Sequence, residues 1–349
     1  MPTITGVRCR PFPHSGRQQL LVDVETDDGL TGTGEAWWGI ASGPAGDPSA
    51  SFAPMVASIE SLLAPRVLGR DATAIERNWQ EVADWAYRYG DGGIITSALA
   101  GIDIALWDLA GKRLGVPVAE LLGGSCHDIL PAYASLPPLR DAALLRQACE
   151  SARAYGFRAF KLHEIDIQLV REARRYIGPD ATLMVDVNGH FDAVEAVAFG
   201  RAMADLDVLW YEEPVRPMRH HGLIARVAQQ QPIPLAGGEN EYTLDEFQRL
   251  LATGAMHWLQ PEVTKIGGLT PARKVAALAE TAGVALAPHN FRIGPSLYAS
   301  IHWGFASPGT QWLELPWIAG GTPFPCGAAL PPVADGHVTL PPGVGLGLG

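Results

Sequence analysis

The stretch LMVDVNGHFDAVEAVAFGRAMADLDVLWYEEP (residues 183–214) contains two short apolar runs with a helical pattern between them. Each apolar run has the length of a strand and ends in polar residues, Asp186 and Asn188 in the first and Glu212 and Glu213 in the second. The connecting residues have the amphipathic spacing of a helix. The stretch therefore predicts one unit in which a helix joins two parallel strands.

The same unit recurs along the chain after residue 128, with apolar runs that begin about 25 residues apart. The runs are AFKLHEI (159–165), LMVDVN (183–188), LWYEEP (209–214), PLAGGEN (234–240), WLQPEV (258–263), ALAPHN (285–290) and WLELP (312–316). This period is typical of a (β/α)8 barrel or of a doubly wound sheet. With YAS (133–135) as a first strand the total is about eight, which favours a closed TIM-type barrel in an α/β fold.

The first third of the chain has a different pattern. QLLVDVETDDGLTGTGEA (19–36) predicts two strands joined by a turn at Asp28-Gly29, and residues 50–112 predict helices, the last of them ended by Gly115 and Pro117. A chain of 349 residues fits one large domain and one smaller domain. We interpret GTGE (32–35) and KIGG (265–268) as glycine turns, because neither has the spacing of a phosphate-binding loop.

Composition excludes several classes of partner. A net charge of −11 argues against a surface for nucleic acid or anionic membranes. No run of about 18 apolar residues is present, so we predict no membrane span. The first residues lack the apolar core of a secretory signal, and the four cysteines lack metal-site spacing, so we expect a cytoplasmic protein.

Every predicted strand after the first is apolar until its carboxyl end, where it gains polar residues. In parallel barrels the active site is built at that end of the strands. One such residue could cap a loop, but a full series in register indicates a functional site. The series is Lys161, His163, Asp186, Asn188, Glu212, Glu213, Glu239, Asn240, Glu262, His289 and Glu314.

Three carboxylates, Asp186, Glu212 and Glu239, end consecutive strands and should lie beside one another. Ionised carboxylates so close together repel and require neutralisation. A hard divalent cation with oxygen ligands provides it, and one Mg²⁺ fits best. The alternative is that each carboxylate pairs with a lysine or arginine, but few of the 26 basic residues fall at strand ends.

Basic groups flank the predicted metal site. Lys161 and His163 are two residues apart on one strand and therefore point to the same side, while His289 ends a strand across the barrel. This arrangement suits removal of the proton α to a carboxylate, with a metal to stabilise the resulting anion. Taken singly, Lys161 could instead be a surface lysine, and His289 a core histidine bonded to a carbonyl group.

Two further carboxylates have two interpretations each. Glu262 could bond to the ring of His289 and raise its basicity, or form a structural ion pair with Lys265. Glu314 could donate a hydrogen bond to a substrate oxygen when protonated, or cap a loop.

The chain resembles the mandelate racemase branch of the enolase superfamily. ALAGIDIALWDLAGKRLGVPVAELLGG (98–124) is similar to the linker segment of that branch. The ordered set K-x-[KH], D-x-N, E-E-P, G-E-N, P-[DE]-x-x-K-x-G-G, a histidine on the seventh strand and W-L-E on the eighth is also similar. Each motif alone is weak, whereas their order along nearly the whole chain is specific.

The resemblance implies a modified (β/α)8 barrel with an α+β capping domain. We expect the capping domain at residues 1–118, the barrel at 119–320 and a C-terminal segment, 321–349, that returns to the cap. It implies Mg²⁺ ligation by Asp186, Glu212 and Glu239, with Glu212 chosen over Glu213 on the family pattern alone. It also implies a catalytic dyad of His289 and Glu262, with Glu314 as hydrogen-bond donor to the substrate.

Substrate contacts are expected from residues near the barrel mouth, and the resemblance suggests a homo-oligomer. The predicted substrate-binding residues are His14 and Trp37, in two N-terminal loops, and Asn188 and Lys265, near strand ends.

Two departures from the family pattern affect the predicted reaction. Branch members commonly have a second lysine where this chain has His163. Lys161 and a cation should lower the pKa of that histidine, so that it either accepts a proton near neutral pH or stays inert and leaves His289 as the only base. Glu262 replaces a usual aspartate and displaces its carboxylate by about 1.5 Å.

These departures favour a reaction that needs one competent dyad. We predict dehydration of an acid sugar, a small carboxylic acid, to a 2-keto-3-deoxy acid. The alternatives are a racemase or epimerase, a cycloisomerase of a hydroxy acid or sugar lactone, and a non-catalytic binding protein on the same scaffold.

Overall fold

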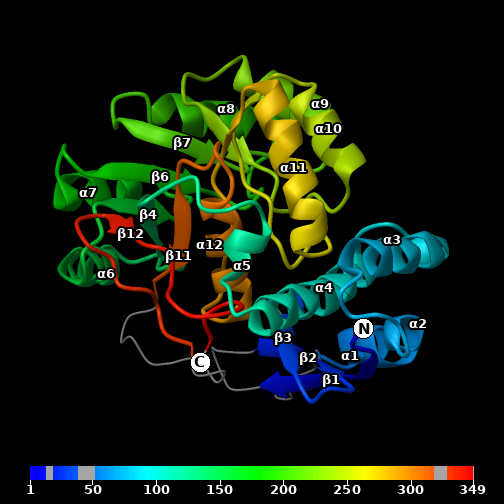
Figure 1. Cartoon of the computed structure of the whole chain (residues 1–349). Coiled ribbons are helices and arrows are strands. Elements are labelled where there is room, and N and C mark those ends of the chain that lie inside the picture. The colour runs from blue at the N-terminus through cyan, green and yellow to red at the C-terminus, as the bar shows by residue number, and fades with distance from the viewer. Residues whose placement is uncertain (13–18, 38–51, 318–327, 349) are drawn as a thin grey trace.

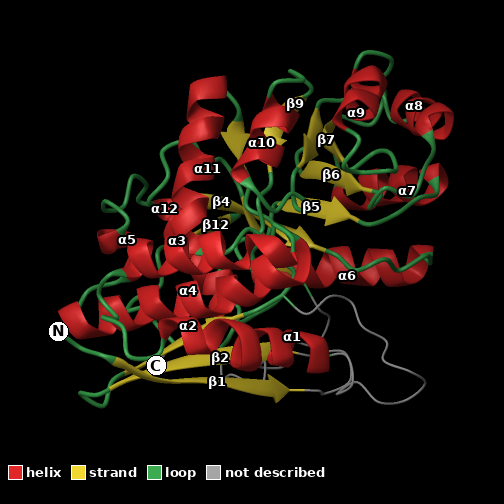
Figure 2. Cartoon of the chain, turned by 90° about the vertical axis from the view of Figure 1, so that its right-hand side faces the viewer, coloured by secondary structure: helices red, strands yellow, loops and turns green. Residues whose placement is uncertain are grey.

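A computed structural model of the chain describes residues 1–12, 19–37, 52–317 and 328–348. A parallel barrel surrounded by helices makes up the larger part, and a small antiparallel sheet with its own helices makes up the rest (Figure 1). Figure 2 shows helices between this sheet and the barrel. The α/β barrel with an α+β cap that the sequence predicts is therefore confirmed.

The antiparallel sheet has the strand order β1-β2-β3. Its strands are β1 (Ile4–Phe12), β2 (Gln19–Thr26) and β3 (Thr31–Glu35). Gly29 has φ +84°, and its N–H donates to the carbonyl oxygen of Thr26 at 3.0 Å, which closes the predicted turn.

The prediction that GTGE forms a turn is wrong, because Gly32 and Gly34 lie within β3. A Cβ atom on Gly34 would lie 2.2 Å from the carbonyl oxygen of Gly101, and one on Gly32 would lie 2.0 Å from that of Ala105. These two glycines therefore allow the strand to lie directly on the helix that contains Gly101 and Ala105.

That helix, α4, is the longest in the described residues and is buried along most of its length. The cap helices are α1 (Ala53–Ala57), the π-helix η2 (Ser58–Leu63), α2 (Ala64–Val67), α3 (Ile75–Ala86), the 3₁₀ turn η3 (Tyr87–Tyr89) and α4 (Gly93–Leu114). Gly115 ends α4 in the left-handed conformation, as predicted.

Helix α4 is long and apolar enough to cross a membrane by length and hydropathy alone. However, 78% of its most apolar 18-residue stretch is buried inside the molecule, which is typical of a core helix.

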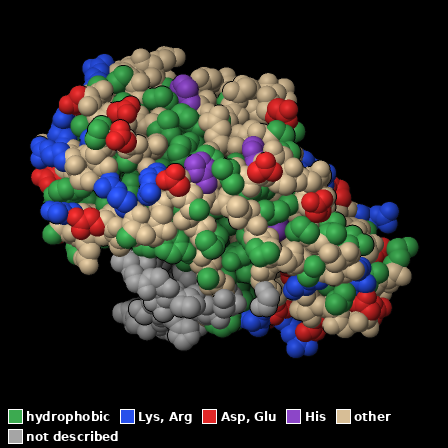
Figure 3. Space-filling view, turned by 60° about the vertical axis from the view of Figure 1, so that its left-hand side comes forward, with side chains coloured by type: hydrophobic (Ala, Val, Ile, Leu, Met, Phe, Trp, Pro, Cys, Tyr) green, Lys and Arg blue, Asp and Glu red, His purple; other side chains and the backbone are tan. Residues whose placement is uncertain are grey.

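On the face shown in Figure 3, acidic and basic side chains are interspersed.

All eight predicted barrel strands are present and parallel, in the order β10-β9-β8-β7-β6-β5-β4-β11. They are β4 (Leu130–Ser135), β5 (Ala159–Leu162), β6 (Thr182–Asp186), β7 (Val208–Glu212), β8 (Leu235–Gly237), β9 (Met256–Leu259), β10 (Ala285–Leu286) and β11 (Leu313–Pro316). A parallel bridge from Leu286 to Thr310, just before β11, joins the two edges and closes the barrel.

Seven helices connect these strands, and short elements precede and follow the barrel. The connecting helices are α6 (Ala142–Tyr155), α7 (Ile167–Ile177), α8 (Ala193–Ala202), α9 (His221–Ala228), α10 (Leu244–Leu251), α11 (Leu269–Ala282) and α12 (Pro295–Phe305). Helix α5 (Val118–Leu121) precedes β4, and β12 (His337–Val338) pairs antiparallel with β4. The C-terminal segment lies against the end of α4, where the N–H of Leu346 donates to Asp108 Oδ1 at 2.9 Å.

An apolar layer fills the barrel beneath its polar strand ends. Its members are Tyr133, Ala159, Met184, Trp210, Ala236 and Ala287, with partly buried Leu209, Trp258 and Trp312 against them. Ala159, Met184 and Trp210 each lie two residues before a polar residue of the site and so point to the same side of their strands. The polar strand ends thus rest on a packed floor that contains no ionisable group except Tyr133.

A buried carboxyl group joins the cap to the barrel. Asp103 of α4 accepts hydrogen bonds from the Thr270 hydroxyl at 2.6 Å and the Thr270 backbone N–H at 2.9 Å, and burial raises the pKa of Asp103 to about 7. Gly268, in the KIGG turn, has φ +103°, and a Cβ atom there would lie 2.3 Å from Asp103 Oδ2. This glycine therefore allows close contact of the two parts.

We expect Gly268→Ala to lower the free energy of unfolding by about 3 kcal/mol, through backbone strain plus the clash with Asp103. Gly90→Ala is the matched control, because Gly90 has φ +98° and a Cβ atom there would have nothing within 4 Å, and it should cost about 1 kcal/mol. Urea denaturation curves measure both. Equal losses would show that the close approach of Gly268 to Asp103 does not matter.

Candidate active site

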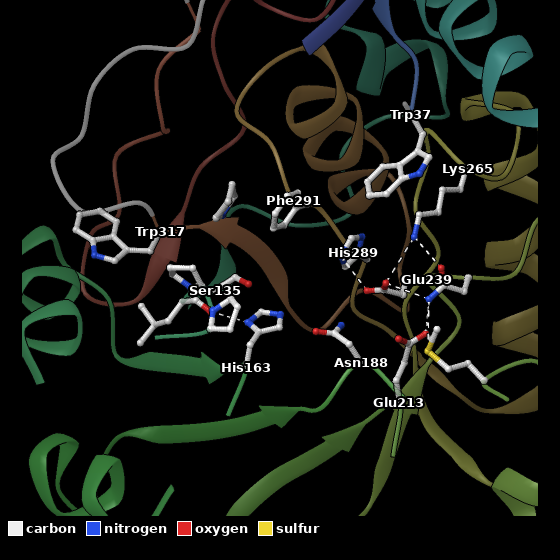
Figure 4. Close-up of a pocket in the computed structure, with 16 residues that line it drawn as sticks. Trp37, Ser135, His163, Asn188, Glu213, Glu239, Lys265, His289, Phe291 and Trp317 are labelled. Atoms are coloured by element: carbon white, nitrogen blue, oxygen red, sulfur yellow. Dashed lines mark hydrogen bonds and ion pairs between the residues drawn. The ribbon is translucent and has the colours of Figure 1, made fainter. Parts of the chain in front are cut away.

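A cavity of about 480 Å³ lies at the carboxyl ends of the barrel strands. Side chains from the cap, from β4 to β11 and from the loops after them line it (Figure 4). The polar residues on its wall include His163, Asn188, Glu213, Glu239, Lys265 and His289. The cavity is therefore at the position where the sequence predicts the site.

The three predicted metal ligands meet beside this cavity. Asp186 and Glu212 are register partners at the ends of β6 and β7, and Glu239 follows β8. One carboxylate oxygen from each lies within 4.8 Å of the others, and all three residues are buried. Burial and the charge of Asp186 raise the pKa of Glu212 to about 8. Because burial and a neighbouring negative charge oppose ionisation of Glu212, a bound cation would stabilise its charged form, so the group could hold a cation.

Glu212 is held by two donors that the sequence analysis did not single out. Its Oε2 accepts hydrogen bonds from Trp210 Nε1 at 2.9 Å and from Gln260 Nε2 at 2.6 Å, and both donors are fully buried. Neither donor is ionisable at neutral pH, so these two hydrogen bonds orient Glu212 without adding positive charge. Gln260 lies at the end of an apolar run, WLQPEV. Its amide side chain at that position was the sequence signal that could have identified it as a site residue.

Lys161 lies among the carboxylates and is not a surface lysine. Its Nζ lies 2.8 Å from Glu212 Oε1, 2.8 Å from Glu314 Oε1 and 3.5 Å from Asp186 Oδ2. Burial alone would lower the pKa of Lys161, but the charges of Glu212 and Glu314 raise it well above its ordinary value. The lysine is therefore held as a cation.

His163 lies beside Lys161, as the strand period predicts. Its Nε2 is 3.1 Å from Asp186 Oδ2, and its Nδ1 is 2.5 Å from the carbonyl oxygen of Leu136. The lowering of its pKa was predicted for a site with a bound cation, and without one the pKa of His163 is raised. Burial does lower the pKa, but the charge of Asp186 raises it further.

His289 is fixed between two carboxylates. Its Nδ1 lies 2.7 Å from Glu262 Oε2 and its Nε2 lies 2.9 Å from Glu239 Oε2. Burial lowers the pKa of His289, but the charges of Glu239 and Glu314 and the two hydrogen bonds raise it well above its ordinary value. Thr264 donates to Glu262 Oε1 from its hydroxyl at 2.7 Å and its backbone N–H at 3.1 Å, which orients the carboxylate.

Lys265 makes its polar contacts with Asn240 and Glu239 rather than the alternative ion pair with Glu262. Its Nζ donates to Asn240 Oδ1 at 3.0 Å and lies 3.5 Å from Glu239 Oε1. Glu314 accepts a hydrogen bond from the backbone N–H of Asn290 at 3.1 Å in addition to its contact with Lys161. It therefore secures the loop after β10 and also lies at the site.

The remaining predicted substrate contacts differ in placement. The Trp37 ring lies close to two cations, with Lys265 Nζ 4.3 Å and Arg292 Cζ 4.5 Å from the ring centroid. Asn188 lines the cavity, and its side chain and backbone N–H also donate to the two oxygens of Asp186, at 3.1 and 2.7 Å. His14 lies outside the described residues.

Glu213 also lines the cavity, although only Glu212 was predicted to act there. Glu213 has φ +42°, and its Oε1 accepts a hydrogen bond from Asn240 Nδ2 at 2.7 Å. Burial and the charge of Glu239 raise its pKa well above the ordinary value. The two neighbouring glutamates are thus distinct, since only Glu212 joins Asp186 and Glu239 in the carboxylate group.

Known proteins match the chain over most of its length. Residues 143–349 match the family described as enolase C-terminal domain-like, and residues 13–123 match the mandelate racemase/muconate lactonizing enzyme N-terminal domain. D-galactarolactone cycloisomerase of Agrobacterium fabrum is 33% identical over 95% of this chain and 89% of that protein. D-galactonate dehydratase of Xanthomonas euvesicatoria is 35% identical over 84% of this chain and 77% of that protein.

Solved structures show the same fold. The 3,6-anhydro-D-galactonate cycloisomerase from Zobellia galactanivorans superposes with a TM-score of 0.86 and 30% sequence identity, over 99% of this chain and 96% of that chain.

We expect Glu212→Gln to weaken Mg²⁺ binding by about tenfold or more, because it replaces one of the three predicted carboxylate ligands with an amide. Glu213→Gln is the matched control, since it replaces a neighbouring buried glutamate that lies outside the carboxylate group, and should bind Mg²⁺ nearly as the wild type does. Isothermal titration with MgCl₂ measures both. If Glu213→Gln weakened Mg²⁺ binding more than Glu212→Gln did, Glu213 rather than Glu212 would be the ligand.

Proposed function

The chain belongs to the mandelate racemase/muconate lactonizing enzyme family of the enolase superfamily, and on this premise we propose that it removes the proton α to the carboxylate of an acid sugar. We propose further that Asp186, Glu212 and Glu239 bind one Mg²⁺ and that the reaction is a dehydration to a 2-keto-3-deoxy acid. The observation that carries the proposal is the histidine held by Glu262 next to three clustered carboxylates.

The donor set supports Mg²⁺ as the bound ion. Three carboxylate oxygens within 4.8 Å of one another match the oxygen-rich, partly open coordination that Mg²⁺ takes beside a substrate. When bound, the ion supplies positive charge that stabilises the anion formed as the α-proton leaves.

His289 is the proposed base. The Nδ1–H group of His289 donates to the Glu262 carboxylate, so Nε2 is the atom that would take a proton from the substrate. In the structure Nε2 lies 2.9 Å from Glu239 Oε2, and it would become available as a base once a bound cation holds Glu239. In a syn elimination the same imidazolium can return that proton to the leaving β-hydroxyl group as water departs. Lys161, a buried cation in contact with Glu212 and Glu314, would contribute positive charge beside the bound substrate.

A cycloisomerase is the second candidate. Two of the matched proteins are named cycloisomerases, of D-galactarolactone and of 3,6-anhydro-D-galactonate. Such a reaction begins with the same proton abstraction at the α-carbon. The two reactions differ in the carbon–oxygen bond that breaks next: dehydration breaks the bond to a hydroxyl group, and cycloisomerisation breaks the bond to the ring oxygen. A racemase or epimerase requires a second base, for which His163 is the candidate. The complete set of acidic and basic groups argues against a non-catalytic binding protein.

His289→Asn should lower turnover on the order of 10³-fold, because it removes the proposed base while keeping a similar shape. Binding of Mg²⁺ should remain. The measurement is proton NMR of substrate consumption and α-proton exchange in D₂O. His257→Asn, which changes an exposed histidine on β9, is the control and should retain full activity. A fully active His289→Asn enzyme would remove His289 from the mechanism.

His163→Ala distinguishes one base from two. We expect this variant to retain dehydration, because His289 supplies the required base, and to lose any α-proton exchange on the opposite face of the substrate. Epimer formation followed by NMR reports that exchange. If dehydration stops while Mg²⁺ affinity is unchanged, His163 rather than His289 is the essential base.

A further inference from the structure

The cavity has two chemically different sides. The charged side carries Glu239, Lys265 and His289, with Asn188 and Glu213 below them in Figure 4. The other side is built by the residues after β4 and at the end of β11. Its members are Leu136, Pro137, Pro138, Pro316 and Trp317, and Phe291 lies between the two sides; we call these six residues the apolar wall (Figure 4).

The apolar wall offers a substrate almost no hydrogen-bond donors. Its prolines have no backbone N–H, and the Trp317 indole N–H donates to Ser151 Oγ at 3.0 Å. The Trp317 ring is also fixed by packing, with centroids 5.1 Å from Tyr155 and 5.7 Å from Phe157. On this side two polar side chains among the described residues line the cavity, Ser135 and His163, and the Nδ1 atom of His163 is 2.5 Å from the carbonyl oxygen of Leu136.

Phe291 presents an accessible apolar surface at the cavity. Its side chain is 42% exposed, and it is the only exposed phenylalanine among the described residues. It lies two positions after His289 and lines the cavity. An exposed aromatic ring at the mouth of a cavity is a site where ligand burial gains hydrophobic stabilisation.

We propose that the substrate is a ring-closed sugar acid, such as a lactone or an anhydro sugar acid, rather than an open-chain polyhydroxy acid. The inference rests on the proton abstraction of the proposed function, which places the carboxylate and the α-carbon at the charged side. Where the β-carbon carries the ring oxygen, the elimination opens the ring and the oxygen stays in the product, so the reaction is cycloisomerisation, the second candidate function. The rest of the molecule then faces the apolar wall. A ring presents C–H groups on one face, which suits aromatic and proline surfaces.

An open-chain acid sugar fits the apolar wall poorly. Its hydroxyl groups would lose water without gaining protein partners, and each such loss weakens binding about tenfold. The wall therefore selects between substrates that share the same reacting carboxylate and differ only in ring closure.

Two matched pairs of acids test the proposal. D-galactarolactone is compared with ring-opened D-galactarate, and 3,6-anhydro-D-galactonate is compared with D-galactonate, each with Mg²⁺ and wild-type protein. Proton NMR measures kcat/KM for consumption. We expect the ring-closed member to be favoured by at least about tenfold in a pair that reacts. Equal or better use of the open-chain member would overturn the proposal.

Phe291 variants show whether the wall causes the preference. Phe291→Asn introduces an amide into the wall and should reduce the ring-to-open ratio of kcat/KM by about tenfold. Phe291→Leu is the matched control, because it keeps an apolar surface, and should retain the ratio. An unchanged ratio in Phe291→Asn would overturn the role of the wall.

Failure of the proposed function gives a different result from failure of this inference. If no acid reacts or loses its α-proton, the proposed function fails, and calorimetric titration of the same four acids into the Mg²⁺-loaded protein still ranks ring against chain. Tighter binding of the ring-closed members supports the wall as a selector. Tighter binding of the open-chain members, or binding of none, overturns it.

Discussion

Three buried carboxylates whose oxygens lie within 4.8 Å of one another repel, and the mouth of the barrel is arranged around that repulsion. Lys161 lies against Glu212 and near Asp186, and His289 and Lys265 lie against Glu239. Uncharged donors, Trp210, Gln260 and Asn188, fix the carboxylate orientations without neutralising them. The protein thus supplies only part of the positive charge that the three carboxylates need. A bound cation would supply the rest.

The cap completes this mouth through a few buried polar contacts. Gln19 of β2 donates to the carbonyl oxygen of Ile293 at 3.0 Å, and the Ser296 backbone N–H donates to Glu35 Oε2 at 3.0 Å. These contacts hold the cap to the loop that follows His289. Trp37 then reaches the cavity between Lys265 and Arg292. A change in the cap is therefore transmitted directly to the loop that carries the proposed base and Phe291 of the apolar wall.

Much of this arrangement was predictable from the sequence, because strand period and polar strand ends are local signals. The eight strands and the clustering of polar side chains at their ends follow from them. The choice of Glu212 over Glu213 came from the family resemblance, and so did the pairing of His289 with Glu262, which the residues alone left open. The features that could not be predicted from the sequence depend on contacts between residues far apart in the chain. Gly32 and Gly34 resemble a turn in the sequence, and only the packing of α4 on β3 explains them. The direction of the His163 pKa depends on its 3.1 Å distance to Asp186, and the roles of Gln260 and Glu213 depend on which neighbours they meet.

The most direct test of the account is deuterium incorporation at the α-carbon, with wild-type protein, D₂O and ring-closed acid sugars, measured with MgCl₂ and again after EDTA treatment. The account predicts exchange or product formation with MgCl₂, none after EDTA, and recovery when Mg²⁺ is added back. Reaction that persists in EDTA would contradict the role of the three carboxylates. Absence of any exchange in protein with bound Mg²⁺ would contradict proton abstraction by His289.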